Sequence, residues 1–227
     1  MSFAYIIRDK GTILVDAGVP KQIDRFADTC ARLSINPSDI QLIVLTHGHW
    51  DHIGSARAIK DLTGAEIALH EYEKDCLQES LDLDVHGVTA FGKIMAGAIR
   101  LAGRIRPEHH LETATVDVVL RDGVLPLAIY GIPGRIFYTP GHTNGSVSVL
   151  LDNGDAMVGD LAMGPSPLGM QAGASIFAED LNEVYKSWKK ILDAGAKTIY
   201  PSHGKRFPAS RLADLLKVAS SLHSASK

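Results

Sequence analysis

The sequence has few cysteines, no long apolar run and no excess of basic residues. Its two cysteines, Cys30 and Cys76, lie far apart and outside every motif described below, so we expect no disulfide framework and a reducing, cytoplasmic location. No segment approaches the roughly 20 apolar residues that span a membrane. The net charge is -3, which indicates neither a nucleic-acid partner nor an anionic membrane as partner.

The overall composition is that of an ordinary globular domain. Apolar residues make up 45% and charged residues 22% of the 227 residues. A chain of this length can bury one full core, so we expect a single domain over residues 1–227. The first eight residues have neither a basic region nor a long apolar stretch, and therefore do not resemble a signal peptide.

The order of apolar patterns predicts alternating strands and helices. Strands are expected at residues 3–8, 12–15, 41–45, 66–69, 116–120, 125–130, 135–139, 146–151, 155–158 and 197–200. Helices are expected at residues 20–33, 53–62, 71–77, 178–192 and 209–222. The apolar, glycine- and alanine-rich segment 81–112 breaks this order, and we interpret it as a helical insertion. The repeated pattern of strands and helices predicts an α/β architecture of two similar halves.

One short segment is rich in groups that bind metals. It places three imidazoles and one carboxylate within six residues, those of His47, His49, Asp51 and His52. The segment directly follows an apolar run, 41–45, which is typical of a buried strand. Zinc and similar metals take imidazole nitrogen and carboxylate oxygen as ligands, several of which must converge on one point. The alternative is a histidine-rich surface loop that binds metal adventitiously.

Four other apolar runs end in the same kind of residue, which favours a built site over a surface loop. The residues just past these runs are Asp16, His142, Asp160 and His203. In α/β sheets, ligands gather at the carboxyl ends of the strands. We therefore predict that several strand ends meet at one metal site.

These motifs resemble those of the metallo-β-lactamase superfamily, over nearly the whole chain. The H-x-H-x-D-H signature of that family appears as His47, His49, Asp51 and His52, and its later ligands appear as His142, Asp160 and His203. The resemblance implies an αββα four-layer sandwich with a helical insertion, and the chain begins at what corresponds to the family's second strand. It also implies a cofactor of two divalent metal ions, with zinc as the first choice and manganese or iron as alternatives.

The resemblance also divides the ligands between the two metals. The first metal would be held by His47, His49 and His142, and the second by Asp51, His52 and His203. Asp160 would bridge the two metals, and Asp16 would orient a ligand histidine by accepting its second ring N–H. A hydroxide shared by the metals would attack the substrate, with Asp51 and Asp160 as the catalytic carboxylates. The sequence has no G-x-S-x-G motif, and neither cysteine neighbours a histidine, so no side-chain nucleophile is evident.

The fold alone does not decide the reaction, because the superfamily carries many chemistries. We expect hydrolysis of a small ester, thioester or lactone. Alternatives are a β-lactam- or phosphodiester-hydrolysing enzyme, a mono-iron oxidoreductase resembling the persulfide dioxygenases, and a metal-binding protein without turnover. The bridging Asp160 disfavours the zinc β-lactamases. Met163 stands where acyl-homoserine lactonases carry a tyrosine, and only 24 residues follow His203, too few for the helical domain of glyoxalase II.

Two apolar segments are candidates for the walls of a substrate pocket, namely the insertion at 81–112 and the loop at 164–170. The alternative for the insertion is contact with a second subunit in a homodimer. His86 would enter the pocket from the insertion. His70, at the end of a predicted strand, either supports a ligand or has a structural role.

Overall fold

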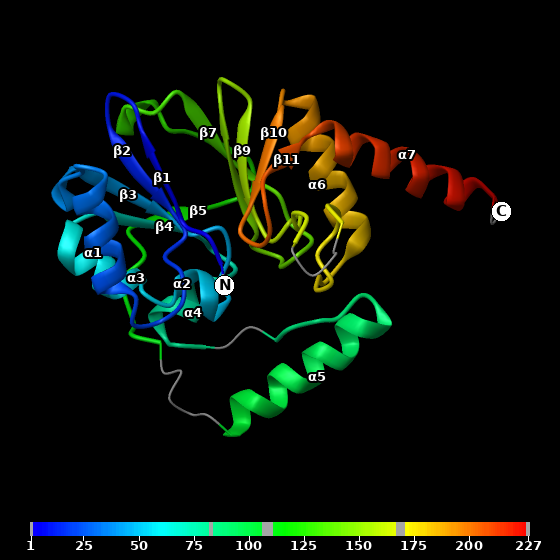
Figure 1. Cartoon of the computed structure of the whole chain (residues 1–227), viewed down its shortest axis with the longest axis horizontal. Helices are drawn as coiled ribbons and strands as arrows, with labels where there is room; N and C mark the ends of the chain where they lie inside the picture. The colour runs from blue at the N-terminus through cyan, green and yellow to red at the C-terminus, as the bar shows by residue number, and fades with distance from the viewer. Residues whose placement is uncertain (1, 82–83, 106–110, 167–170, 226–227) are drawn as a thin grey trace.

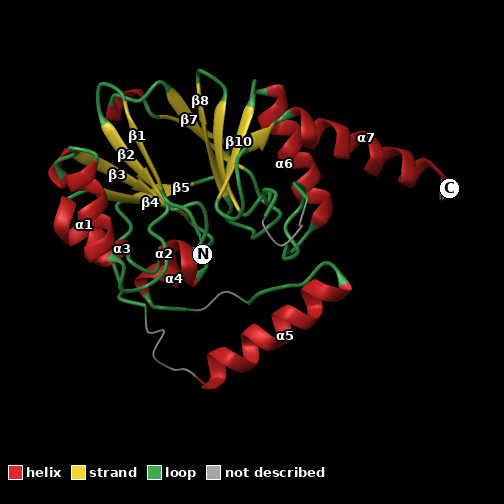
Figure 2. Cartoon of the chain, viewed as in Figure 1, coloured by secondary structure: helices red, strands yellow, loops and turns green. Residues whose placement is uncertain are grey.

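The computed structural model describes residues 2–81, 84–105, 111–166 and 171–225. Two β-sheets lie face to face, and helices cover their outer faces (Figures 1 and 2). The first sheet contains Tyr5–Arg8 (β1), Thr12–Val15 (β2), Ile40–Val44 (β3), Glu66–His70 (β4) and Val118–Leu120 (β5), in the order β1-β2-β3-β4-β5. β1 pairs antiparallel with β2, and the other strands of this sheet are parallel.

The second sheet has the order β11-β10-β9-β8-β7-β6. Its strands are Val124–Pro126 (β6), Gly134–Tyr138 (β7), Val147–Leu151 (β8), Asp155–Gly159 (β9), Thr198–Pro201 (β10) and Phe207–Pro208 (β11). Only β9 and β10 pair in parallel, and the other neighbours are antiparallel. As a result β7, β9 and β10 all run in the same direction and end at the same edge of this sheet.

The two faces of each sheet are buried in different ways. In β2, Ile13 and Val15 point into the core between the sheets, where they meet Val149 and Met157 of the second sheet. Leu14 points to the opposite face and packs beneath the helices of the first half. This alternation follows from the two-residue period of a strand, and it explains why β2 is apolar on both faces.

Helices form the two outer layers. Ile23–Arg32 (α1) and Ala56–Thr63 (α3) cover the first sheet through Cys30 and Ile59. Leu181–Asp193 (α6) and Ser210–Ala225 (α7) cover the second sheet through Trp188 and Leu212. The order helix, sheet, sheet, helix confirms the predicted αββα sandwich. Among the described residues, no helix has the length and apolar content needed to cross a membrane.

The structure corrects the sequence prediction in a few places. The predicted strand at 125–130 is wrong beyond Pro126, because the chain turns there into a short 3₁₀ helix, Ala128–Tyr130 (η2). Leu127 anchors that turn, since its carbonyl accepts the N–H of Tyr130 at 3.0 Å. The elements Pro37–Asp39 (η1) and β11 were not predicted because they are too short to show a pattern. The predicted helix at 53–62 is two helices, Trp50–Ile53 (α2) and α3.

The segment interpreted as an insertion contains the helix Ala90–Ile105 (α5). In Figure 1 this helix lies below the edge of the sheets at which α2 and the helix Lys74–Gln78 (α4) are found. The segment that precedes α5 pairs with the loop that precedes α6. Gly87 forms a β-bridge with Phe177, and the N–H of Val88 donates to the carbonyl of Ile176 at 3.0 Å. Residues 82–83 and 106–110 of the insertion, and 167–170 of the predicted pocket loop, lie outside the described residues.

The indole of Trp188 connects α6 to the chain just past β9. It is 1% exposed, and its Nε1–H donates to the carbonyl of Leu161 at 2.9 Å. We expect Trp188→Ala to lower the free energy of unfolding of the metal-free protein by about 3–5 kcal/mol, because it removes a large buried side chain. Leu62→Ala, at a position 43% exposed, should change it by less than about 1 kcal/mol. Urea unfolding of both variants measures this, and equal losses would contradict the packing described.

Candidate metal centre

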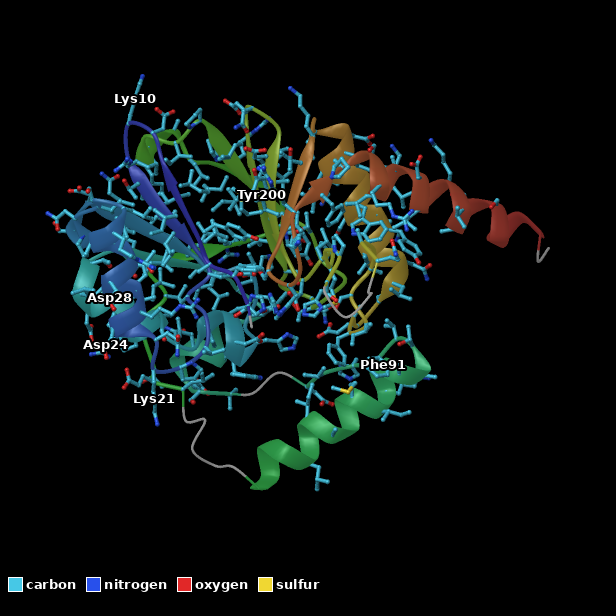
Figure 3. The ribbon with its side chains drawn as sticks, viewed as in Figure 1. Lys10, Lys21, Asp24, Asp28, Phe91 and Tyr200 are labelled. Carbon is cyan, nitrogen blue, oxygen red and sulfur yellow. The ribbon has the colours of Figure 1, made fainter. Side chains whose placement is uncertain are left out.

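Five strands of the two sheets deliver polar side chains at one edge of the sandwich. β2 is followed by Asp16, and β3 by the segment that begins at Thr46. In the second sheet, β7, β9 and β10 are followed by His142, Asp160 and His203. The β1–β2 turn, marked by Lys10 in Figure 3, lies at the opposite edge. Because these strand ends share one edge, Asp16 and Ser202, which are 186 positions apart in the sequence, can form a hydrogen bond.

The structure brings together all seven residues that the sequence predicts as metal ligands. Their side chains form three groups whose potential ligand atoms lie within 4.8 Å of one another: His47, His49 and His142; His47, His52 and Asp160; and Asp51, His52 and His203. Each group offers three nitrogen or oxygen atoms, which is the number of protein ligands typical of a catalytic zinc site. The groups share His47 and His52, so the seven residues form one continuous cluster, which is consistent with a dinuclear metal centre.

The carboxylate of Asp160 lies between two of these groups. Its Oδ1 is 3.6 Å from Nε2 of His52 and 3.5 Å from Nε2 of His203. Its Oδ2 is 3.9 Å from Nε2 of His142. Oδ1 of Asp160 thus faces His52 and His203, whereas Oδ2 faces His142, which is the position of a carboxylate that two ions can share.

Hydrogen bonds determine which ring nitrogen of two histidines is free. Nδ1 of His142 lies 2.9 Å from the carbonyl of Phe177, and Nδ1 of His52 lies 2.8 Å from Oδ2 of Asp16. Because both partners only accept, each Nδ1 carries the proton and donates it. In the neutral form of each ring, which is the form that binds a metal, the lone pair of Nε2 is then directed at the cluster.

His47 is oriented through a hydroxyl. Oγ1 of Thr46 lies 2.8 Å from Oδ1 of Asp16 and 3.1 Å from Nδ1 of His47. The single hydrogen of the hydroxyl goes to the carboxylate, so its oxygen accepts the proton of His47 Nδ1. His49 is different, because it turns Nδ1 toward the cluster, 3.1 Å from Nε2 of His142.

The donor set fits a bound cation. Among the described residues, buried atoms without a hydrogen-bond partner include Nε2 of His47, Nε2 of His52 and Oδ1 of Asp160. A buried polar atom left without a partner costs about 1–3 kcal/mol. All three atoms point into the cluster, and a cation there would satisfy them together. Imidazole with carboxylate is also the ligand set that zinc and similar metals prefer.

Asp16 is the centre of the network behind the ligands. Its side chain is fully buried and accepts hydrogen bonds from the backbone and hydroxyl of Thr46, from His52, and from the hydroxyl of Ser202 at 2.9 Å. The backbone φ angle of Asp16 is +62°, a left-handed conformation that is strained for residues other than glycine. Ser202, which directly precedes His203, was not predicted as part of the site, because nothing in the sequence separates it from a turn serine.

The two ends of the cluster differ in their affinity for protons. Burial lowers the pKa of His47 and His142 well below the usual value, and lowers that of His49 to about 4. Burial acts in the same direction on His52, but Asp16 and Asp160 outweigh it and raise its pKa to about 10. Against the effect of burial, hydrogen bonding to Asp51 and the charge of Asp160 raise the pKa of His203.

The insertion is connected to His142 through a single peptide unit. The carbonyl of Phe177 accepts from Nδ1 of His142, and the N–H of Ala178, in the same peptide, donates to the carbonyl of His86 at 2.9 Å. The side chain of His86 is about half exposed and lies 3.7 Å from Asp84. The structure therefore places the backbone of His86 behind a predicted ligand.

His70 lies away from the cluster's three groups. It is buried and stacks on Tyr138, with ring centroids 4.6 Å apart and an angle of 16° between the rings. Its Nε2 is 3.6 Å from the carboxylate of Asp122. These contacts indicate the structural role that was one of its two predicted roles.

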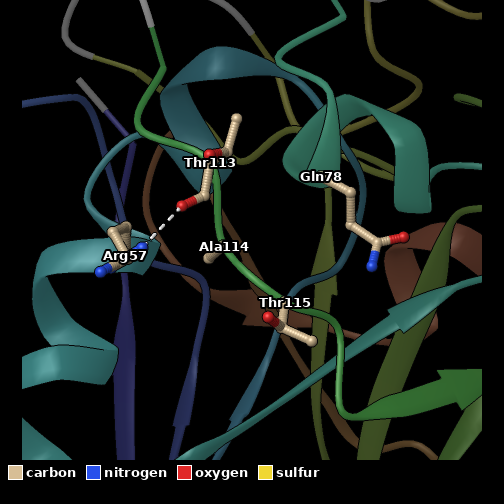
Figure 4. Close-up of a pocket in the computed structure, with 5 residues that line it drawn as sticks. All are labelled: Arg57, Gln78, Thr113, Ala114 and Thr115. Atoms are coloured by element: carbon tan, nitrogen blue, oxygen red, sulfur yellow. Dashed lines mark hydrogen bonds between the residues drawn. The ribbon is translucent and has the colours of Figure 1, made fainter.

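A separate hollow of about 190 Å³ lies on the outer surface (Figure 4). It is lined by Arg57, Gln78, Thr113, Ala114 and Thr115. The guanidinium of Arg57 donates to the carbonyl of Thr113 at 3.3 Å and pairs with Asp61 at 2.7 Å. None of the lining side chains is an imidazole or a carboxylate, so we do not assign this hollow to the metal chemistry.

The chain belongs to the metallo-β-lactamase superfamily, because the family model of that superfamily matches residues 1–203. This confirms the predicted family. The "Beta-lactamase-like protein 2 homolog" of Drosophila melanogaster is 31% identical over 199 residues, which cover 85% of this chain and 54% of that protein. This chain thus spans about half the length of that relative.

Two further proteins illustrate the range of the superfamily. The "Atrochrysone carboxyl ACP thioesterase" of Aspergillus fumigatus is 26% identical over 170 residues, which cover 73% of this chain and 38% of that protein. The crystal structure of the BLEG-1 B3 metallo-beta-lactamase matches with a TM-score of 0.67 at 22% identity, covering 93% of this chain and 90% of that one. The second similarity supports the fold.

Asp16→Asn should weaken metal binding. An amide cannot accept from all four donors around Asp16, and its NH₂ group would face one of them. We expect the affinity for zinc to fall by about 10–100-fold, the usual effect of losing a partner behind a ligand. Competition with a chromophoric chelator measures the affinity. Asp9→Asn, in the exposed turn at the opposite edge, is the control, and equal affinities for the two variants would contradict the role of Asp16.

The difference in pKa predicts that acid releases two metal ions in two steps. Protons compete for His52 and His203 at a higher pH than for His49, because the pKa values of the first two are raised and that of the third is lowered. As the pH falls from about 8 to about 4, we expect the ion held by Asp51, His52 and His203 to leave first. Metal content after equilibration at each pH measures this.

A variant in which the group of Asp51, His52 and His203 is incomplete is the control for this titration. His203→Ala should bind one ion per chain and release it only in the later step. Loss of both ions from the unaltered protein in one step, at one pH, would contradict the assignment.

Proposed function

We propose that this protein is a metal-dependent hydrolase that cleaves a small ester, thioester or lactone with two divalent ions. The proposal rests above all on Asp160, whose Oδ1 faces His52 and His203 and whose Oδ2 faces His142. In this assignment the first ion would be held by His47, His49 and His142, and the second by Asp51, His52 and His203. Asp160 would be shared between the two ions. When bound, such ions polarise the substrate carbonyl and supply hydroxide at neutral pH.

The group of Asp51, His52 and His203 supports a pair of ions rather than a single iron. In an oxidoreductase of the persulfide dioxygenase type, Asp51, His52 and His203 would bind no metal. Here their potential ligand atoms lie within 4.8 Å of one another, and Nε2 of His203 is 3.2 Å from Oδ2 of Asp51. Ligand atoms that converge in this way are suited to bind a second ion. Because two ions suit hydrolysis better than oxygen chemistry at a single iron, we favour hydrolysis.

Asp51 is suited to move a proton. Its side chain is about 20% exposed, whereas that of Asp160 is about 8% exposed, so Asp51 is the carboxylate that reaches the solvent side. Burial alone would raise the pKa of Asp51, but the hydrogen bond with His203 and the nearby imidazoles hold it well below the usual range. A carboxylate of this kind holds a proton only briefly. We therefore assign Oδ2 of Asp51 as the relay that passes a proton to the leaving group.

The choice of an acyl substrate rests on the surroundings of the cluster and on one relative. The Aspergillus fumigatus relative is named as a thioesterase. The insertion, which attaches beside His142, carries apolar side chains that are well exposed: Phe91, Ile94 and Leu101. We infer that residues 84–105 form one wall of the substrate pocket and favour a partly apolar substrate.

A panel of substrates tests the reaction class. The purified protein, loaded with zinc, manganese or iron, is assayed against an ester, a thioester, a lactone, a β-lactam and a phosphodiester. We expect turnover of one of the first three with two ions bound per chain. Turnover of the β-lactam or the phosphodiester alone would replace the proposed substrate class, and oxygen consumption with one iron per chain would replace the reaction.

Asp160→Asn tests the role of the shared carboxylate. An amide has only one oxygen to offer, so the variant should lose one of the two ions, and kcat/KM should fall at least about 100-fold. Cys76→Ala is the control, because the Sγ of Cys76 lies near the backbone of Gly48 and Cys76 could be mistaken for a nucleophile. This variant should keep most of the activity. A single turnover in heavy-oxygen water should place the label directly in the product acid, and a covalent acyl intermediate would overturn the mechanism.

A further inference from the structure

A buried glutamate lies between the two loops that carry the first group of predicted ligands. Glu73 is 2% exposed and lies in the turn between β4 and α4. Its Oε2 accepts the backbone N–H of Gly48. Its Oε1 accepts the backbone N–H of Gly145 at 2.8 Å and also the hydroxyl of Thr143. One carboxylate thus satisfies three donors from two separate loops.

These donors are immediate neighbours of the ligands. Gly48 stands between His47 and His49, and Thr143 directly follows His142. The first loop leaves β3 of the first sheet, and the second loop connects β7 to β8 of the second sheet. Glu73 therefore joins, across the two sheets, the loops that supply the three imidazoles of one group.

The backbone of both loops comes unusually close to this side chain. A Cβ atom placed on Gly145 would lie 2.6 Å from Cγ of Glu73, and one placed on Gly48 would lie 3.1 Å from its Oε2. The first distance is far shorter than any ordinary contact, so Gly145 cannot carry a side chain while Glu73 stays in place. The two glycines and the glutamate form one fitted unit.

A buried carboxylate is an expensive way to join two loops, because removing its charge from water costs free energy that a neutral side chain would not. Three donors offset that cost here. Their directions also fix the carboxylate tightly, since each oxygen has an assigned partner. A backbone hydrogen bond from the N–H of Val147 to the carbonyl of Thr46, at 2.8 Å, joins the two loops at their base. Nearer the ligands, Glu73 connects Gly48 to Thr143 and Gly145.

We propose that Glu73 is a positioning residue, which holds the His47–His49 loop and the His142 loop at the separation that binds the first metal ion. The inference rests on the metal assignment made under the proposed function. It concerns the first group of ligands, because, among the described residues, the side chain of Glu73 bonds only to the neighbours of His47, His49 and His142. Asp51 and His52 follow in α2, where Asp16 holds His52, and His203 follows β10. Changes at Glu73 should therefore affect the first ion and leave the second unchanged.

The test measures metal binding in chains that keep one group each. In a His203→Ala background only the first group is complete, and in a His49→Ala background only the second is. Glu73→Gln keeps the size of the side chain, but its NH₂ group must face one of the three donors. We expect it to weaken cobalt(II) binding about 10–100-fold in the first background and to leave it unchanged in the second. Chelator competition gives the affinities, and the visible spectrum of bound cobalt reports the geometry of the first group.

Two controls separate positioning from general stability. Glu71→Gln makes the same chemical change two residues earlier, at a side chain that is about one-third exposed and pairs with Arg121, and should have no effect on cobalt binding. Thr143→Val removes one donor to Glu73 without changing Glu73 itself and should weaken cobalt binding by His47, His49 and His142. Thr143→Ser keeps the hydroxyl and should bind cobalt as the unaltered chain does. These two variants keep the inference testable if Glu73→Gln does not fold.

The outcomes distinguish this inference from the proposed function. Equal weakening in both backgrounds, or unchanged cobalt affinity and spectrum in all Glu73 and Thr143 variants, would overturn the role of Glu73 while two metal ions still bind. If the unaltered protein binds no ion at the first group, the metal assignment itself fails, and the inference fails with it.

Discussion

The carboxylate of Asp16 joins the parts of the molecule on which the site depends. It accepts hydrogen bonds from Thr46 and His52, which belong to the first half of the chain, and from Ser202, which belongs to the second. No apolar contact could set these distances so closely, because dispersion has little direction. A fully buried carboxylate with four donors leaves few alternative arrangements, and this restriction explains how the strained backbone of Asp16 is maintained.

The cluster is built so that its ligands are oriented before any ion arrives. His47, His52 and His142 each use Nδ1 to contact a hydroxyl, a carboxylate or a backbone carbonyl. Nε2 of His47 and Nε2 of His52 have no hydrogen-bond partner among the described residues, so an incoming cation meets ring nitrogens that already point at it. The entropy of ordering these rings is lost during folding, and binding does not have to supply it again. Such preorganisation is what a site needs when metal spacing controls chemistry.

Most strands and helices and all the ligand types could be predicted from the sequence, because apolar runs and the H-x-H-x-D-H motif are local patterns. The arrangement of the strands in a sandwich of two sheets was implied by the family resemblance. The strand predicted at 125–130 was wrong past Pro126, where Leu127 begins a 3₁₀ helix, an outcome that local apolarity does not reveal. Glu73 could not be predicted, because its partners Gly48 and Gly145 lie 25 and 72 residues away. The exposure of Phe91 could not be predicted from the sequence either, because an apolar helix rich in glycine and alanine has no clearly polar face that would mark its solvent side.

The peptide unit between Phe177 and Ala178 contacts both the metal-ligand region and the insertion through its main-chain atoms. It holds His142 on one side and the insertion on the other, and both contacts use main-chain atoms. Main-chain hydrogen bonds survive when side chains are exchanged, provided that the backbone keeps its path and proline is avoided. The insertion could therefore accumulate substitutions while the imidazole behind it keeps the same tautomer and orientation. Under the proposed function, the pocket wall and the metal ligands could then change independently of each other.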